Sequence, residues 1–156
     1  MNQAAAILRS VTTLGDLRER FGLTIGQAVD TDRVYLLLPE PEFYAQRFPA
    51  VQEGSRTMRM ELHRDQAIIA HLERTQEAIV LDELHRVRST AELERVRRQM
   101  KSLHIGFAMG IFSRDQLAGV MLLGPRRSGH IYGTVEQGAL GVRCGQLAVA
   151  CGDAQL

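Results

Sequence analysis

The sequence lacks the features that mark secreted and membrane-spanning proteins. Its 156 residues include only two cysteines, Cys144 and Cys151, too few for a disulfide framework. No apolar run approaches the roughly 20 residues of a membrane helix, and the N-terminus has no basic segment followed by a long apolar stretch, as a signal peptide would. We therefore expect a cytoplasmic location, although a parent protein could still be anchored in a membrane by other segments.

Excess charge of one sign is also lacking. The formal net charge is +1, and Lys101 is the only lysine, so nearly all the positive charge is arginine scattered among glutamates. Such a balance provides no field that attracts nucleic acid or an anionic membrane. We expect neither partner.

What is present is the composition of one folded domain, because 45% of the residues are hydrophobic and 24% are charged. We predict a single domain over 1–156, with an N-terminal helix over 1–29, a sheet with intervening helices over 33–124 and a C-terminal helix over 134–156. Terminal helices around a sheet built partly of hairpins indicate an α+β layered fold.

Local patterns place the elements between the terminal helices. Short apolar or alternating runs predict strands at 34–38, 43–48, 57–62 and 78–81. Asp65 is the predicted N-cap of one helix, and Ser89 to Glu92 has the form of a capping box that opens another. Thr134 to Gln137 repeats that form before the last helix.

The strongest β signal is a hairpin of 105–112 and 117–123. Alternation places Ile105, Phe107, Met109 and Ile111 on one face, where they fill a core or line a cavity, and glycine and alanine on the other. The last helix has few polar residues, so we expect the sheet on one side of it and another helix on the other.

The apolar positions of the predicted C-terminal helix recur at spacings of four and three: Leu140, Cys144, Leu147, Cys151 and Ala154.

No catalytic or metal-binding pattern is visible. The histidines at 63, 71, 85, 104 and 130 show no ligand spacing, and the glycine-rich loop 124–129 is not followed by the Lys-Ser/Thr of a phosphate-binding loop. Arg126 and Arg127 in that loop either contact an anion or belong to a solvated connection. Cys144 and Cys151 would lie about 10 Å apart along one helix, beyond the reach of an intrachain disulfide, which leaves a symmetric pair across a parallel dimer as an alternative to small apolar core residues.

Residues 61–150 resemble the GAF domains of sensor histidine kinases and related signalling proteins. The resemblance rests on 65–72, on Glu77 to Leu84, and above all on the segment from Gln116 to Gly129, with its strand glycine and Gly-Pro-Arg-Arg-Ser-Gly loop. Tyr132, Thr134 and Glu136 follow, and Gln146 to Ala150 matches the closing helix. Gly138, Gly141 and Gly145 depart from the pattern, because family helices usually carry leucine or other helix formers there.

The resemblance implies an antiparallel sheet of five or six strands, with both terminal helices on one face and a ligand-sized pocket under a helix and loop layer on the other. From that layout and strand alternation we predict these pocket residues: Tyr35, Met60, Leu62, Ile68, Leu72, Met100, His104, Phe107 and Met109. The same residues would instead simply fill the core if the domain binds nothing. The cofactor is unknown; cyclic GMP, bilin and haem are each disfavoured, and no metal site is expected.

We expect a regulatory fragment that is not itself an enzyme and that acts on a covalently linked output domain, such as a histidine kinase. A homodimer through the terminal helices would form its seam from Val11, Leu14, Leu140, Cys144, Leu147 and Cys151. The alternatives are a ligand-free dimerisation module and, least favoured, a redox enzyme resembling the GAF-like methionine sulfoxide reductases.

Overall fold

One antiparallel sheet forms the centre of the molecule. The computed structural model describes the backbone of residues 3–52 and 54–155 and the side chains of residues 16–52 and 54–149. Six strands make up the sheet: β1 (Val34–Pro39), β2 (Phe43–Phe48), β3 (Glu61–His63), β4 (Ile79–Val80), β5 (Phe107–Ser113) and β6 (Gln116–Leu123). Their order across the sheet is β3-β2-β1-β6-β5-β4, and every neighbouring pair is antiparallel. This confirms the α+β fold expected from the sequence.

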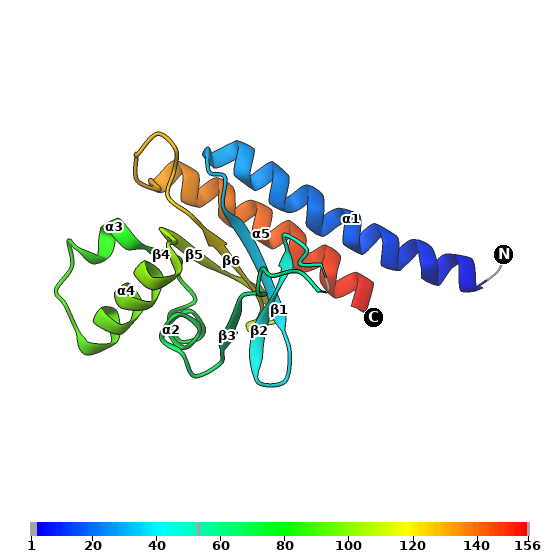
Figure 1. Cartoon of the computed structure of the whole chain (residues 1–156), viewed down its shortest axis with the longest axis horizontal. Helices are drawn as coiled ribbons and strands as arrows, with labels where there is room; N and C mark the ends of the chain where they lie inside the picture. The colour runs from blue at the N-terminus through cyan, green and yellow to red at the C-terminus, as the bar shows by residue number, and fades with distance from the viewer. Residues whose placement is uncertain (1–2, 53, 156) are drawn as a thin grey trace.

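The helices form layers on the two faces of the sheet (Figure 1). The long terminal helices α1 (Gln3–Val29) and α5 (Thr134–Gln155) run side by side across one face. The other face is covered by α2 (Ala67–Thr75) and α4 (Ala91–Leu103), while the single-turn α3 (Leu81–Leu84) follows β4. Among the described helices, none combines the length and apolarity needed to cross a membrane.

Both faces of the sheet are apolar, and one hydrophobic cluster lies on each face. Phe107, Met121 and Leu36 pack with Phe21, Ile25 and the buried side of α5. On the other face, Leu37, Val120 and Leu122 pack with the buried residues of α2 and α4. Burial of these side chains supplies most of the free energy that holds the layers together.

The central hairpin is tighter than the expected four-residue connection. Only Arg114 and Asp115 lie between β5 and β6, with φ values of 52° and 63°. Two consecutive positive φ angles are those of a type I′ turn, whose twist matches that of antiparallel strands. The face assignment was wrong at Ile105, which joins the α2/α4 cluster because the strand begins only at Phe107.

Several predicted helix starts are corrected by the structure. The N-cap of α4 is Thr90, whose side chain accepts a hydrogen bond from the Leu93 amide, whereas the Ser89 hydroxyl donates to Glu94. Gln66, not Asp65, precedes α2, and the Ile68 amide donates to the Gln99 side chain of α4 at 2.9 Å. A long-range partner therefore replaces local capping at α2, whereas α4 keeps a local cap that is shifted by one residue from the predicted position. The strand expected at 57–62 is confined to β3.

Candidate functional site

The predicted pocket residues on the α2/α4 face form a packed core. Ile68, Leu72 and Met100 have no exposed surface, and Leu62 is 2% exposed. Tyr35 and Met60 pack partly buried against the same cluster. These six residues are thus brought together as predicted, and their side chains fill the space between the sheet and the two helices.

The remaining three pocket candidates lie elsewhere, so their assignment to this face was wrong. Phe107 and Met109 point to the opposite face, where they pack against the α1/α5 cluster. His104 ends α4 in the left-handed conformation, with φ 57°, and its side chain is exposed. Sequence alternation showed that Phe107 and Met109 share a face but did not show which helices cover it.

The predicted dimer seam is corrected in the same way. Leu140, Cys144 and Leu147 are between 1% and 3% exposed, because they face the sheet within one chain. They are therefore part of the core and are not available to a second chain. Val11, Leu14 and Cys151 lie in helical segments whose side chains are outside the described residues.

The outward side of α5 carries an apolar stripe that the sequence reasoning missed. Val135, Val142 and Val149 are 83%, 62% and 65% exposed and stand seven residues apart. Gly138 and Gly145 lie between them, so valine and glycine alternate at spacings of three and four, as in the a and d positions of a heptad. Searching for a second heptad phase in this helix would have found the stripe.

No described residue outside the helix packs against the glycines on this side of α5. An added β-carbon at Gly138, Gly141 or Gly145 would have no neighbour within 4 Å apart from the helix itself. Each glycine costs about 1 kcal/mol relative to alanine in a helix interior. Packing within the described chain therefore does not compensate for this cost.

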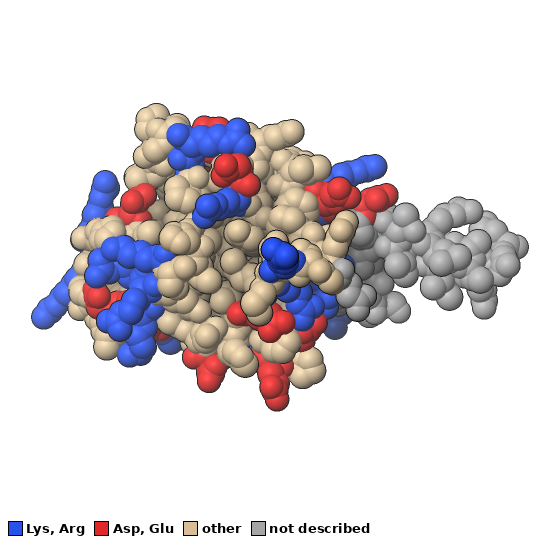
Figure 2. Space-filling view, viewed as in Figure 1, with Lys and Arg blue, Asp and Glu red and all other residues tan. Residues whose placement is uncertain are grey.

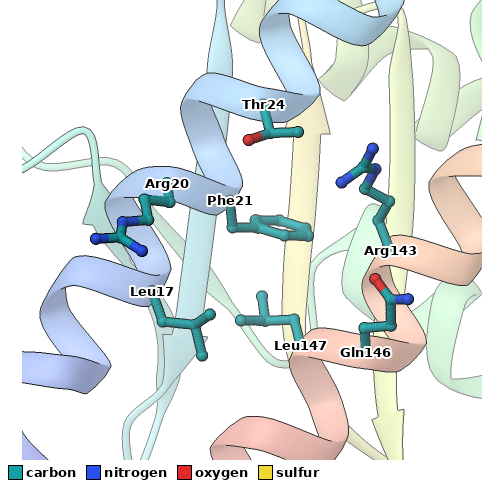
Figure 3. A pocket seen from close by; sticks show the side chains of 7 residues that line it. All are labelled: Leu17, Arg20, Phe21, Thr24, Arg143, Gln146 and Leu147. Carbon is teal, nitrogen blue, oxygen red and sulfur yellow. The ribbon is translucent and has the colours of Figure 1, made fainter.

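A groove of about 200 Å³ lies between the two terminal helices. Leu17, Phe21 and Leu147 point toward one another at its base, and Thr24 and Arg143 lie above them (Figure 3). Arg20 and Gln146 complete the described lining, with the Arg20 side chain directed away from the apolar group in this view. The groove joins α1 to α5 on the helical layer, far from the predicted pocket face.

Arg126 links the end of α1 to the start of α5 through hydrogen bonds and an ion pair. Its guanidinium donates to the carbonyl oxygens of Val29 at 3.0 Å and Ile131 at 3.2 Å, and pairs with the Glu136 carboxylate at 3.1 Å. Its side chain is only 16% exposed. Arg126 is therefore a structural link between the terminal helices, whereas the side chain of Arg127 is exposed.

Cys144 has no features of a reactive thiol. It is 3% exposed, and burial raises its pKa to about 12. A thiolate is the nucleophilic form of cysteine, so this thiol is almost wholly protonated at neutral pH. Within the described residues, no group of three histidine, cysteine or acidic side chains is arranged to hold a metal ion.

Basic side chains gather over α4 and the segment before it (Figure 2). Arg86, Arg88, Arg95, Arg98 and Lys101 are exposed there. Acidic residues are interspersed: Glu92 pairs with Arg74 at 2.6 Å and Glu94 pairs with Arg97 at 3.1 Å. This mixed surface is typical of a solvated face.

Comparison with solved structures decides the fold. A GAF domain/HD domain protein from Geobacter sulfurreducens superposes with a TM-score of 0.66, covering 92% of this chain and 95% of that chain at 12% identity. Residues 122 to 287 of a methyl-accepting chemotaxis protein give 0.67, with 90% of each chain covered at 11% identity. The GAF domain of a two-component sensor histidine kinase from Bacillus halodurans gives 0.61, covering 90% and 94% at 15% identity. The chain has the GAF fold.

No protein-family model and no curated protein matches the sequence. In this GAF fold the helical face formed by α1 and α5 carries both the groove and the exposed valine stripe, and the Arg126 link lies at one end of it. On the opposite face of the sheet, the side chains between the strands and the helices α2 and α4 are packed in the core. The terminal helices are therefore the candidate functional surface of this domain.

Proposed function

We propose that this chain is a sensory or regulatory domain of a larger cytoplasmic signalling protein and is not itself an enzyme. GAF folds of similar structure occur in a two-component sensor histidine kinase and a GAF/HD protein. The two terminal helices lie in contact, and the start of α1 and the end of α5 lie at the same end of the molecule (Figure 1). A covalently linked output domain attached there would respond directly to movement of these helices.

The observation that carries the proposal is the exposed valine stripe on α5. In our proposal two copies pair through this stripe, with Val135, Val142 and Val149 in the seam. Valine suits the a positions of paired helices, and glycine at the intervening positions lets two backbones approach closely. Burial of the three largely exposed valines of each chain would also offset the cost of the glycines in this helix.

The dimer could transmit a signal if the paired helices pack in two alternative arrangements. A ligand or partner that binds one arrangement more tightly shifts the population toward it, and the shift reaches the output domain through α1 and α5. Arg126 would couple the movements of the two helices, because it donates a hydrogen bond to the end of α1 and forms an ion pair with the start of α5.

Sedimentation equilibrium tests the seam. The wild-type chain is expected to dimerise at micromolar concentration, and Val142→Glu should make it monomeric because two carboxylates would meet in an apolar contact. Val87→Glu is the matched control, since Val87 is 51% exposed on the connection before α4, away from the stripe. A monomeric wild type, or equal effects of the two variants, would refute the seam.

A second candidate is a purely structural dimerisation module that binds no ligand. The packing of Ile68, Leu72 and Met100 with no exposed surface favours it over a ligand on the α2/α4 face. Native mass spectrometry of the chain purified from cells separates the two, because a retained small molecule supports sensing. The sulfoxide reductase alternative is disfavoured by the high pKa of Cys144.

A further inference from the structure

We infer that the groove between α1 and α5 is a binding site for a small organic carboxylate with a compact apolar body. The inference concerns ligand binding by one chain and does not depend on the dimer seam. It goes beyond the proposed function because it places a ligand on the helical face.

The base of the groove supplies an apolar contact surface. Phe21 is 9% exposed and Leu147 is 3% exposed, so both are anchored in the core and fix the shape of the groove base. Leu17 completes the base, and its side chain points toward Leu147 (Figure 3). A preformed apolar surface of this kind favours a ligand with a ring or short hydrocarbon chain.

The volume of the groove suits a small molecule. The groove measures about 200 Å³. An enclosed apolar cavity of about 150 Å³ accepts benzene. A benzene ring with one carboxylate group therefore matches the available space, whereas a nucleotide or a tetrapyrrole exceeds it.

The polar residues at the rim of the groove favour a negatively charged ligand. None of the seven described lining residues is acidic, and two are arginines. Neither Arg20 nor Arg143 forms an ion pair with a described side chain. A guanidinium matches a carboxylate geometrically and binds it through two parallel hydrogen bonds.

The two arginines have different roles. Arg143 extends on the groove side of α5 toward Thr24, while Arg20 is directed along the outer side of α1 in this view (Figure 3). We therefore assign Arg143 as the carboxylate anchor, with Gln146 and Thr24 as neutral hydrogen-bonding partners. Arg20 contributes longer-range attraction, which salt weakens.

Isothermal titration of the whole chain with benzoate, phenylacetate and hexanoate tests the site. At least one is expected to bind with a Kd of about 0.1–1 mM, as suits a ligand of about ten non-hydrogen atoms. Benzamide and benzylamine should bind at least 10-fold more weakly, because they lack the carboxylate. Acetate should also bind at least 10-fold more weakly, because it lacks the apolar body.

Three variants locate the binding. Arg143→Gln should weaken binding at least 10-fold and remove the preference for benzoate over benzamide, whereas Arg20→Gln should weaken it only two- to threefold. Thr24→Leu should abolish binding by filling the groove from its rim. Arg95→Gln is the matched control, because it removes an exposed arginine from α4 that makes no ion pair with a described side chain. Circular dichroism establishes that each variant is folded.

Two results would overturn the inference. One is the absence of saturable binding by all three carboxylates. The other is an equal loss of binding in the Arg143→Gln and Arg95→Gln variants, which would indicate non-specific charge attraction. The titration is repeated with the Val142→Glu variant, which is expected to be monomeric. Because the groove lies within one chain, binding should persist in this variant, so failure of the groove is distinguishable from failure of the seam.

Discussion

The aromatic ring of Phe48, at the end of β2, occupies the space that a side chain at Gly22 of α1 would need. An ideal β-carbon at Gly22 would lie 2.2 Å from Cε1 of Phe48 and 2.4 Å from its Cδ1. This close approach explains a glycine in the interior of α1, where alanine would otherwise be the better helix former. The contact also fixes how closely α1 lies against the end of β2.

Replacing Gly22 by alanine is therefore expected to destabilise the protein. The ring of Phe48 must move, at a cost of about 1–3 kcal/mol, which outweighs a gain of about 1 kcal/mol in helix propensity. Urea unfolding should show a net loss of up to about 2 kcal/mol. The double variant Gly22→Ala/Phe48→Ala should lose less stability than the sum of the losses in the two single variants. Strict additivity would contradict the steric contact.

Gly145→Ala on α5 should have the opposite effect on stability. Apart from the helix backbone, no described atom lies within 4 Å of the position that its β-carbon would take, so dilute monomeric protein should gain about 1 kcal/mol in unfolding free energy. In the proposed seam the same methyl group would separate the two helices and raise the dimer dissociation constant at least several-fold. Unfolding at low concentration and sedimentation at high concentration measure the two effects independently.

Arg126→Ala should cost about 2–3 kcal/mol, because it leaves two backbone carbonyls and the Glu136 carboxylate without their charged partner. Arg127→Ala is the control: the neighbouring side chain is exposed, so its removal should change stability by less than about 0.5 kcal/mol. Chemical denaturation compares the two variants. A similar cost at both positions would show that Arg126 does not link the terminal helices.

Cys144 should react very slowly with thiol reagents in the native chain. Burial raises its pKa from 9.0 to about 12, which lowers the thiolate fraction at neutral pH roughly 1,000-fold, and burial also blocks access. The measurement is the rate of labelling by a disulfide reagent in a Cys151→Ser background, with and without denaturant. Rapid labelling of the folded protein would reopen the redox alternative.

Alkaline pH should destabilise the fold through Tyr132. Burial raises its pKa from 10.0 to about 12, and its hydroxyl donates to the Gly124 carbonyl. The folded state then holds the proton more tightly than the unfolded state, so this contribution is constant below about pH 10 and is lost as the pH rises toward 12. Tyr132→Phe should lower stability at pH 7 by about 1 kcal/mol yet reduce its pH dependence between pH 10 and 12. An unchanged slope would contradict the assignment.

Much of the fold was predictable because local patterns determine it. The strand alternation and the turn signal between the two strands predicted the central hairpin. The spacing of Leu140, Cys144 and Leu147 placed them on one side of α5, but it did not show that this side packs against the sheet and not against a second chain. The candidate site was not predictable to the same degree. The groove depends on how α1 and α5 lie against each other, and Arg126 bonds to Val29 across 97 residues of sequence.

The sequence by itself determined that this chain forms a layered α+β domain with an antiparallel hairpin and apolar terminal helices, since side-chain periodicity follows directly from backbone geometry. Only the tertiary structure decided which face of the sheet each apolar side chain occupies. Both faces are covered and apolar, so alternation alone treats Phe107 and Ile105 alike although they lie in different clusters. The same packing buried Cys144 against the sheet and left Val142 exposed on the opposite side of α5.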